Sequence, residues 1–186
     1  MIIKSKAIVI KSFSYGETSL ISRLILDSGQ KLSLMIKGAK SLKSNKTALF
    51  QSLNFISMDY YHKENRDMQL FKEGVLIDGF QGVKKTFESM KYGLCMIDIM
   101  DKALPKEYQD KAMFDITYQC LNKINQNQDH KIIFIFFLLL FAHHNGYSLH
   151  ELHLHSLNAD DILNIFIKDD CDNNQYKAQM ESVREL

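Results

Sequence analysis

The stretch Lys31–Lys46 reads KLSLMIKGAKSLKSNK, and it decides the fold that we predict. In its first half, Leu32, Leu34 and Ile36 stand at every second position, which is the spacing of a strand with one buried face. The pattern breaks at Gly38, and the lysines that follow stand at every third position. With five lysines and no acidic residue in sixteen positions, this strand and loop suit a phosphate backbone, because each neutralised phosphate releases counterions. The alternative is a solvated hairpin that binds nothing.

Four other short segments have the composition of strands and are separated by turn signals. The five predicted strands are Ile2–Lys11, Thr18–Leu26, Lys31–Lys37, Asn54–His62 and Met68–Lys72. Tyr15-Gly16 lies in the first turn, and Asp27-Ser28-Gly29-Gln30 leads from the second strand into the third. Five strands with tight turns in about 75 residues predict a small antiparallel barrel of the oligonucleotide/oligosaccharide-binding (OB) type.

Beyond Gly82 the apolar residues follow the period of amphipathic helices. The predicted helices are Val83–Leu104, Lys106–Ile124 and Lys131–His144. Pro105 ends the first, whose inward face is predicted at positions 83, 87, 90, 94, 97 and 100–101. The third is apolar almost all round and should be the centre of a helical bundle, with Asp129 as its N-cap. Tyr176–Leu186 has the pattern of a helix that stops early, so we expect a truncated chain.

These segments predict an α+β protein with two domains. A five-stranded OB-type β-barrel is expected over residues 1–78, followed by an α-helical bundle domain over residues 79–186. Met1–Lys46 carries nine basic and two acidic residues, a net charge of +7, whereas the rest of the chain carries a net charge of −6. A basic N-terminal module on a mildly acidic body indicates one face that binds a polyanion.

The three cysteines, Cys95, Cys120 and Cys171, are far apart and lack CxxC spacing. This pattern argues against a disulfide framework and a thiolate zinc site, and it fits a reducing cytosol. The most apolar run, Ile132–Ala142, has eleven residues, fewer than the roughly 20 that a bilayer span needs. The N-terminal segment is interrupted by lysine too often for a secretory signal. We therefore expect a cytoplasmic protein.

No pattern of an active site is found in the sequence. Neither a GxxxxGK[ST] nor a GxGxxG phosphate cradle is present, and no serine or cysteine stands in a nucleophile motif. A cluster of histidines invites a metal site, but it lacks HExxH spacing and an evident third ligand: His143, His144, His150, His153 and His155. We predict no enzyme, no cofactor and no metal site. The alternative is a metal-dependent enzyme built on the His143–His155 cluster.

The aromatic residues of the predicted barrel support binding instead. Phe13, Tyr15, Tyr60 and Tyr61 lie in or beside strands near the lysines. Aromatic side chains beside a basic groove bind single-stranded nucleic acid without sequence preference, and each stacked base contributes ~1–3 kcal/mol. Any one of these rings by itself is better explained by core or hairpin packing. Together with the basic segment, they predict a nucleic-acid-binding barrel.

Several motifs resemble those of the bacterial RecO family of recombination mediators. They are AIVI at 7–10, YGETS at 15–19, KGAKSLKS at 37–44, LFQSL at 49–53 and YHKENR at 61–66. Asn145-Gly146-Tyr147, after the apolar helix, is similar to the Gly-Tyr or Gly-Phe that closes the corresponding helix in that family. The resemblance covers most of the chain and is most specific in its first 75 residues.

The resemblance implies a protein without enzymatic turnover that binds single- and double-stranded DNA and anneals complementary strands. With RecR, such proteins help to load recombinase onto strands coated by single-strand-binding protein (SSB). The matching phosphate-contacting positions are Lys37, Lys40 and Lys43, with Arg23, Lys31 and Lys46 as neighbours. In that family the barrel also contacts RecR, and a pocket in the helical domain takes the acidic, aromatic C-terminal tail of SSB. Candidates for pairing with the carboxylates of the tail are Lys84, Lys85, Lys91 and Lys123.

Three departures from the family pattern matter. Many relatives carry a four-cysteine zinc element after the Gly-Tyr, and no such cluster of cysteines follows here, so no structural zinc is expected. Ser52 stands where Pro is usual, and relatives extend beyond Leu186. The alternative function is that of an RNA-binding OB-fold protein in translation or RNA decay.

Overall fold

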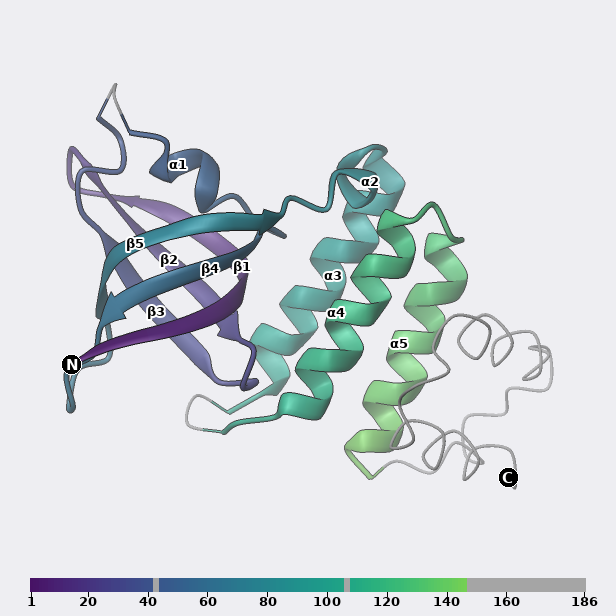
Figure 1. Ribbon diagram of the computed structural model, residues 1–186. Helices are drawn as coiled ribbons and strands as arrows, with labels where there is room; N and C mark the ends of the chain where they lie inside the picture. Colours follow the sequence, from purple (N-terminus) through teal and green to yellow (C-terminus); the bar gives the residue numbers. More distant parts are fainter. Residues whose placement is uncertain (42–43, 106–107, 147–186) are drawn as a thin grey trace. The chain divides into compact units, whose positions relative to one another are not determined.

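The computed structural model describes residues 1–41, 44–105 and 108–146. The N-terminal part of the chain forms a β-barrel and the following part forms α-helices (Figure 1). Met1–Phe134 make up one compact unit. The α+β class and the barrel followed by helices are thus as predicted.

Five strands close the barrel in the order β1-β2-β3-β5-β4. Their bounds are β1 Ile2–Tyr15, β2 Ser19–Leu26, β3 Lys31–Ile36, β4 Phe55–Tyr61 and β5 Gln69–Asp78. Neighbouring strands are antiparallel except β3 and β5, which share a short parallel contact. β5 is longer than predicted. Gly74 interrupts the strand pattern in the sequence, but in the barrel it lets β5 pass β4 so closely that a Cβ would lie 2.7 Å from the Ser57 carbonyl oxygen.

A β-bulge at Ile10 decides which side chains of β1 point outward. The register against β2 shifts between Val9, which pairs with the core residue Leu24, and Lys11, which pairs with Arg23. In a regular strand the side chain of Lys11 would point inward, as that of Val9 does. The extra residue therefore turns Lys11, and the alternate positions that follow it, toward the outside of the barrel.

A short helix that the sequence did not predict, α1 Lys46–Leu49, lies between β3 and β4. Asn54 holds its C-terminal end, because the Asn54 amide donates to the carbonyl oxygens of Ala48 and Leu49 at 2.9 and 3.0 Å. The next residue, Phe50, is buried in the barrel core and meets the ring of Phe71 edge to face. In Figure 1, α1 lies at the end of the barrel that also carries the β1–β2 turn.

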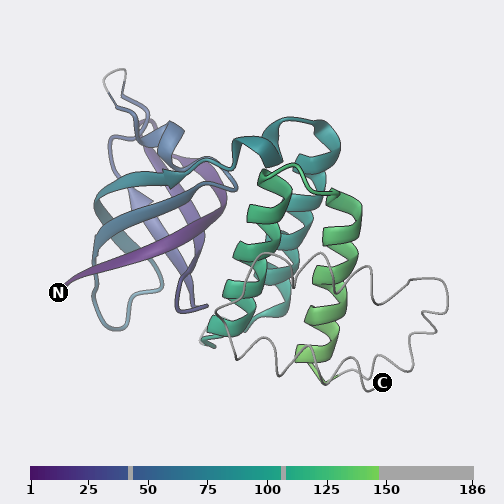
Figure 2. The ribbon, with the colours of Figure 1, turned by 45° about the vertical axis from the view of Figure 1, so that its right-hand side comes forward.

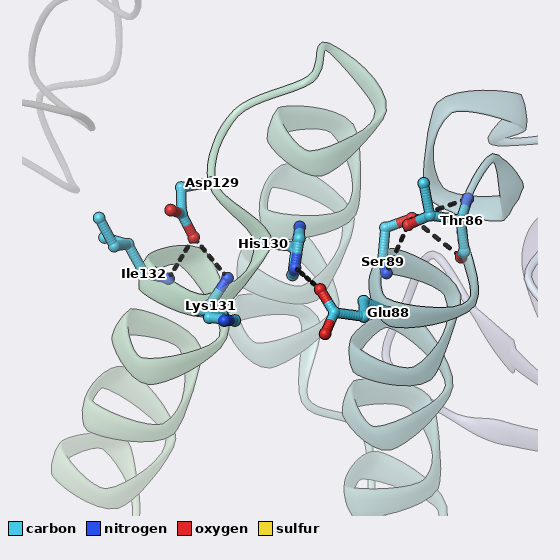
Figure 3. Close-up of polar contacts among 7 residues, drawn as sticks. All are labelled: Thr86, Glu88, Ser89, Asp129, His130, Lys131 and Ile132. Carbon is cyan, nitrogen blue, oxygen red and sulfur yellow. Dashed lines mark hydrogen bonds and ion pairs between the residues drawn. The ribbon is translucent and has the colours of Figure 1, made fainter.

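The first predicted helix is divided into α2 Gln81–Lys84 and α3 Phe87–Ala103. Thr86 and Ser89 form a capping box: the Ser89 N–H donates to Thr86 Oγ1 at 3.1 Å, and the Thr86 N–H donates to Ser89 Oγ at 3.3 Å (Figure 3). Because this box satisfies the first backbone donors of a new helix, α3 begins there. The prediction of one continuous helix was wrong.

Two further helices follow, α4 Lys111–Asn125 and α5 His130–His144. Figure 2 shows α3 and α4 side by side. The N-cap of α5 is Asp129, as predicted. Its Oδ1 accepts from the backbone N–H groups of Lys131 at 2.8 Å and Ile132 at 3.2 Å (Figure 3), and these hydrogen bonds, that from Ile132 foremost, lower the pKa of Asp129.

The first turn of α5 contacts α3. His130 Nε2 lies 3.5 Å from Glu88 Oε2 (Figure 3), an ion-pair distance without hydrogen-bond alignment. The His130 ring also lies against the ring of Tyr92, with 5.3 Å between their centres. These contacts join the N-terminal turns of two helices that are far apart in the sequence.

Candidate nucleic-acid interface

At one end of the barrel, the β1–β2 turn is hydrogen-bonded to the loop after β3. The backbone N–H of Lys40 donates to the Thr18 carbonyl oxygen at 3.0 Å, and Lys40 Nζ donates to that of Gly16 at 3.2 Å. Gly16 and Gly38 have φ values of 58° and 64°, which glycine adopts without steric cost. The Tyr15-Gly16 turn and the break at Gly38 therefore meet at one place.

Residues 37–46 form what we call the lysine loop, and its flanks are anchored on the barrel. Ala39 is buried in the barrel core, and its carbonyl oxygen accepts from Thr47 Oγ1 at 2.9 Å. Lys46 Nζ donates to the Lys37 carbonyl oxygen at 3.2 Å and lies 5.9 Å from the centre of the Phe71 ring. The half-buried Lys46 thus has a structural role in holding the loop.

Lys37 and Lys40 are the exposed lysines in the described part of this loop. Lys43 lies outside the described residues. Across the described ranges of the chain, neither Lys37 nor Lys40 has an ion-pair partner. Both positive charges are therefore available to an anion at this end of the barrel.

Arg23 and Lys31, predicted as neighbours of the phosphate contacts, both contact Asp101 of α3. An Arg23 guanidinium nitrogen lies 2.7 Å from Asp101 Oδ1, as an ion pair without hydrogen-bond alignment, and Lys11 Nζ lies 3.3 Å from Oδ2. Lys31 Nζ donates to the Asp101 carbonyl oxygen at 2.8 Å. We call these four residues the Asp101 cluster. While it is intact, its three cations are largely engaged within the protein.

The position of Asp101 explains why it needs several cations. Its side chain is only 3% exposed, and it lies in the last turn of α3, where the helix dipole disfavours an anion. A buried carboxylate requires compensating charge. A signal for this cluster was present in the sequence, because position 101 falls on the predicted inward face of a helix. The role of Lys11 was not predicted.

Phe13 and Tyr15 lie on the outer face of β1, beside the lysine loop. The two residues are 47% and 52% exposed. Phe13 pairs with Ile21 of β2, which in turn pairs with Met35 of β3, so an apolar row crosses three strands. Tyr15 pairs with Ser19, at the β2 end of the same turn. Two exposed rings and two unpaired lysines therefore share one end of the barrel.

The other two aromatic candidates lie elsewhere. Tyr60 is 4% exposed in the barrel core, and its burial raises the pKa of the phenol. Tyr60 therefore cannot offer its face to a base, and the core-packing explanation holds for it. Tyr61 is exposed, but it pairs with Ile2 at the opposite end of β1.

The four lysines predicted to contact a partner differ in burial. Lys84 Nζ donates to Asn54 Oδ1 at 2.6 Å, and burial lowers the pKa of Lys84. Lys123 is 5% exposed. Lys85 and Lys91 are exposed on the surface. Only the last two offer their charge readily to a partner.

Beside Lys91 is an apolar groove of about 450 Å³ that we call the α3 groove. It is lined by Ile10, Phe87, Met90, Leu94, Cys95 and Ile97, with the charged residues Lys11, Lys91 and Asp98. The predicted inward face of this helix was right at Ile97, Met100 and Asp101, which are buried, but wrong toward its N-terminus. Gly93 and Met96 are buried, whereas Phe87 is 77% exposed and helps to line the groove.

Metal binding and membrane spanning are two further possibilities for this chain. Among the described side chains, no group of three or more His, Cys, Asp or Glu could hold a metal ion. His143 and His144 lie in the last turn of α5, whereas His150, His153 and His155 lie outside the described residues. No helix in the described ranges has the length and apolar character needed to cross a membrane.

Comparison with known proteins gives one consistent family. The N-terminal model of Recombination protein O matches residues 1–80, and its C-terminal model matches residues 85–176. Relatives named DNA repair protein RecO include that of Salinibacter ruber, which is 30% identical over 124 residues, 67% of this chain and 48% of the relative. Another is that of Chlorobium limicola, which is 27% identical over 140 residues, 75% of this chain and 54% of the relative. The chain spans about half the length of the curated relatives it matches. Because the two family models cover both the barrel and the helices, the chain belongs to the Recombination protein O (RecO) family.

Proposed function

We propose that this chain is a non-enzymatic, DNA-binding and strand-annealing recombination mediator of DNA repair, which works in the cytoplasm with RecR and SSB to load recombinase on single-stranded DNA. Lys37, Lys40 and Lys43 of the lysine loop are its phosphate contacts. Residues 1–78 serve as the DNA-binding domain and residues 79–186 as the partner-binding domain. Family membership supports this proposal, as does the chemistry of the barrel end.

The observation that carries the proposal is the difference between two groups of cations on one barrel. Lys37 and Lys40 have no ion-pair partner in the described residues and are exposed. Lys11 and Arg23, by contrast, are paired with the Asp101 carboxylate, and the half-buried Lys31 donates to the Asp101 carbonyl oxygen. Binding to phosphate releases counterions only where the cation is not already neutralised by the protein. We therefore assign DNA binding to the lysine loop rather than to the whole basic N-terminal segment.

Annealing follows from the same charges. Two complementary strands repel each other through their phosphates, and this repulsion falls when cations lie between them. Contacts to phosphate carry no sequence information, so one basic loop can serve any pair of strands. The mechanism requires no bond to be made or broken by the protein.

The double variant Lys37→Ala/Lys40→Ala should weaken binding to all DNA sequences and flatten its salt dependence. The slope of log Kobs against log salt concentration loses roughly 0.9 for each phosphate contact removed on duplex and roughly 0.7 on a single strand. For two lysines we therefore expect the slope on duplex to decrease in magnitude by about 1.8. Fluorescence anisotropy at several salt concentrations measures it. The matched control is Lys4→Ala/Lys6→Ala, which removes two exposed lysines near the other end of β1.

An unchanged slope for Lys37→Ala/Lys40→Ala, or the same decrease for Lys4→Ala/Lys6→Ala, would mean that the lysine loop is only a solvated hairpin. Competition with an RNA oligonucleotide of the same sequence separates the two functional classes. A clear preference for RNA would favour a role in translation or RNA decay over DNA repair.

We further propose that the α3 groove takes the acidic, aromatic C-terminal tail of SSB. Apolar side chains line the groove, and the exposed Lys91 supplies positive charge beside it. An aromatic residue fills such a groove, and a carboxylate pairs with a lysine next to it. The barrel surface is left for RecR.

Lys91→Glu should weaken binding of a labelled peptide with the sequence of that tail by roughly tenfold, because it replaces a charge-assisted contact worth about 1.5 kcal/mol by a repulsion. Lys85→Glu is the matched control, since Lys85 is exposed but does not line the groove. Equal effects of the two substitutions in a peptide titration would contradict the location of the site.

A further inference from the structure

We infer that Phe13 and Tyr15 form a platform on which unpaired bases stack, so that this end of the barrel distinguishes single-stranded from duplex DNA. The inference rests on the proposed function and adds to it two residues that discriminate between forms of the ligand. The lysine loop holds phosphates of either form, whereas the rings bind only a base whose face is free.

The two rings are an unusual pair for a protein surface. They occupy alternate positions on the outer face of β1, so their Cα atoms are roughly 7 Å apart along the strand. Each of the two residues is about half exposed. In the described part of the chain neither ring contacts another aromatic ring. Exposed aromatic side chains grouped in this way indicate a surface that binds a ligand.

The backbone shows how the rings come to point outward. Without the bulge at Ile10, the side chains of Phe13 and Tyr15 would point into the barrel, as those of Ala7 and Val9 do. The bulge turns them to the outside, and bulges often re-aim side chains beside functional sites. One extra residue in β1 thus places two rings on the surface.

Lysines lie at both ends of the platform, but only those at the Tyr15 end are available to a ligand. Lys37 follows directly after Ile36, which pairs with Leu20, so it continues β3 toward the level of Tyr15. Lys40 is hydrogen-bonded to Gly16, the residue after Tyr15. Beyond Phe13, the next outward position of β1 is Lys11, which is engaged by Asp101. Available positive charge therefore lies beside the Tyr15 end of the platform.

This arrangement predicts different roles for rings and lysines. In duplex DNA each base is paired and stacked between its neighbours, so its faces are closed to a protein ring. In a single strand the bases can turn out and stack on Phe13 or Tyr15, while the phosphates meet Lys37 and Lys40. Loss of the rings should therefore affect only single strands, whereas loss of the lysines should affect both forms.

The test is the double variant Phe13→Ala/Tyr15→Ala, titrated with an oligothymidine and with a blunt duplex of equal length. We expect roughly a tenfold or greater loss of affinity for the single strand, less than about a twofold change for the duplex, and an unchanged salt slope on both. Tyr61→Ala removes an exposed ring at the other end of β1 and should change neither affinity. Phe13→Tyr/Tyr15→Phe keeps both rings and should retain binding.

A second variant reports stacking directly. The chain contains no tryptophan, so Phe13→Trp introduces a single emitter at the platform. The tryptophan emission, excited beyond the absorption of the tyrosines, should be quenched by oligothymidine and much less by duplex, and that of Tyr61→Trp by neither. An unquenched Phe13→Trp, together with equal losses on both forms of DNA for the double alanine variant, would overturn the platform and leave the lysine loop in place. If the unaltered protein binds neither form, both the proposed function and the platform fall.

Discussion

Gly29→Ala should lower the free energy of unfolding by roughly 2–5 kcal/mol. Gly29 lies in the β2–β3 turn with a φ of 82°, a conformation that disfavours a side chain. A Cβ at this position would lie 2.1 Å from the carbonyl carbon and oxygen of Asp110, which is the N-cap of α4. Because the obstacle is backbone on both sides, the turn or the start of α4 must move.

Gly16→Ala is the matched control for this prediction. Gly16 also has a positive φ, 58°, but nothing lies within 4 Å of the position of its Cβ. Only the conformational cost remains, about 1 kcal/mol. Urea denaturation followed by circular dichroism compares the two variants. Equal losses for Gly29→Ala and Gly16→Ala would show that the close approach of the turn to α4 does not hold in solution.

Asp101→Ala should have two opposite effects, a loss of stability and a gain in DNA affinity. Removing one partner of a buried ion pair is strongly destabilising, but Lys11 and Arg23 are 48% and 37% exposed, so we expect about 2 kcal/mol rather than more. The same change frees Lys11 and Arg23 on the outer face of the barrel, whereas Lys31 keeps its hydrogen bond to the main-chain carbonyl of residue 101. If both freed cations then contact phosphate, the slope of log Kobs against log salt concentration on duplex becomes steeper by about 1.8.

Asp98→Ala provides the control, because it removes the same charge from the same helix. Asp98 pairs with the exposed Lys102 four residues later and takes no part in the Asp101 cluster. We expect a loss below about 1 kcal/mol and an unchanged salt slope. Thermal unfolding and anisotropy titrations on both variants decide the matter. If Asp101→Ala and Asp98→Ala give the same result in thermal unfolding and in the anisotropy titrations, the cations of the cluster are not held by Asp101.

The strand pattern was predictable where hydrophobic alternation is regular. Leu34 and Ile36 are buried as their parity in Lys31–Lys46 required. The bulge at Ile10 was not predictable, because Ile8, Val9 and Ile10 all favour a strand and nothing in the sequence marks the extra residue. This one residue determines whether Phe13 faces the core or the solvent.

The helices show a similar limit. Asp129 could be assigned as a cap because a short polar side chain preceded an apolar run. The break between α2 and α3 depends on Thr86 and Ser89, whose spacing is that of a capping box but with Ser in place of the usual Glu or Gln. The inward face of α3 was predicted correctly at Ile97, Met100 and Asp101 but wrongly at Phe87, since apolar residues surround more than half of the helix. Those left outside form the α3 groove.

The sequence predicted that the candidate site is basic, but not which of the basic residues are available to bind DNA. The sequence grouped all the lysines and arginines of the N-terminal segment, because charge can be counted without knowing what each side chain faces. Pairing of Arg23 and Lys31 with Asp101 joins residues about 70 positions apart, as the hydrogen bond from Lys31 shows. Such pairing depends on the register of two strands and the rotation of a helix. Only the folded chain separates the available cations from the engaged ones.

The most direct test of the central claim is the salt dependence of single-strand binding by the unaltered chain. A labelled oligonucleotide is titrated by fluorescence anisotropy at several salt concentrations and with several base compositions. We predict tight binding at low salt, similar affinity for all compositions, and a linear decrease of log Kobs with log salt concentration, with a slope of roughly −0.7 for each phosphate contacted. Absence of binding at low salt, or an affinity that does not respond to salt, would contradict the claim that the lysine loop binds a phosphate backbone.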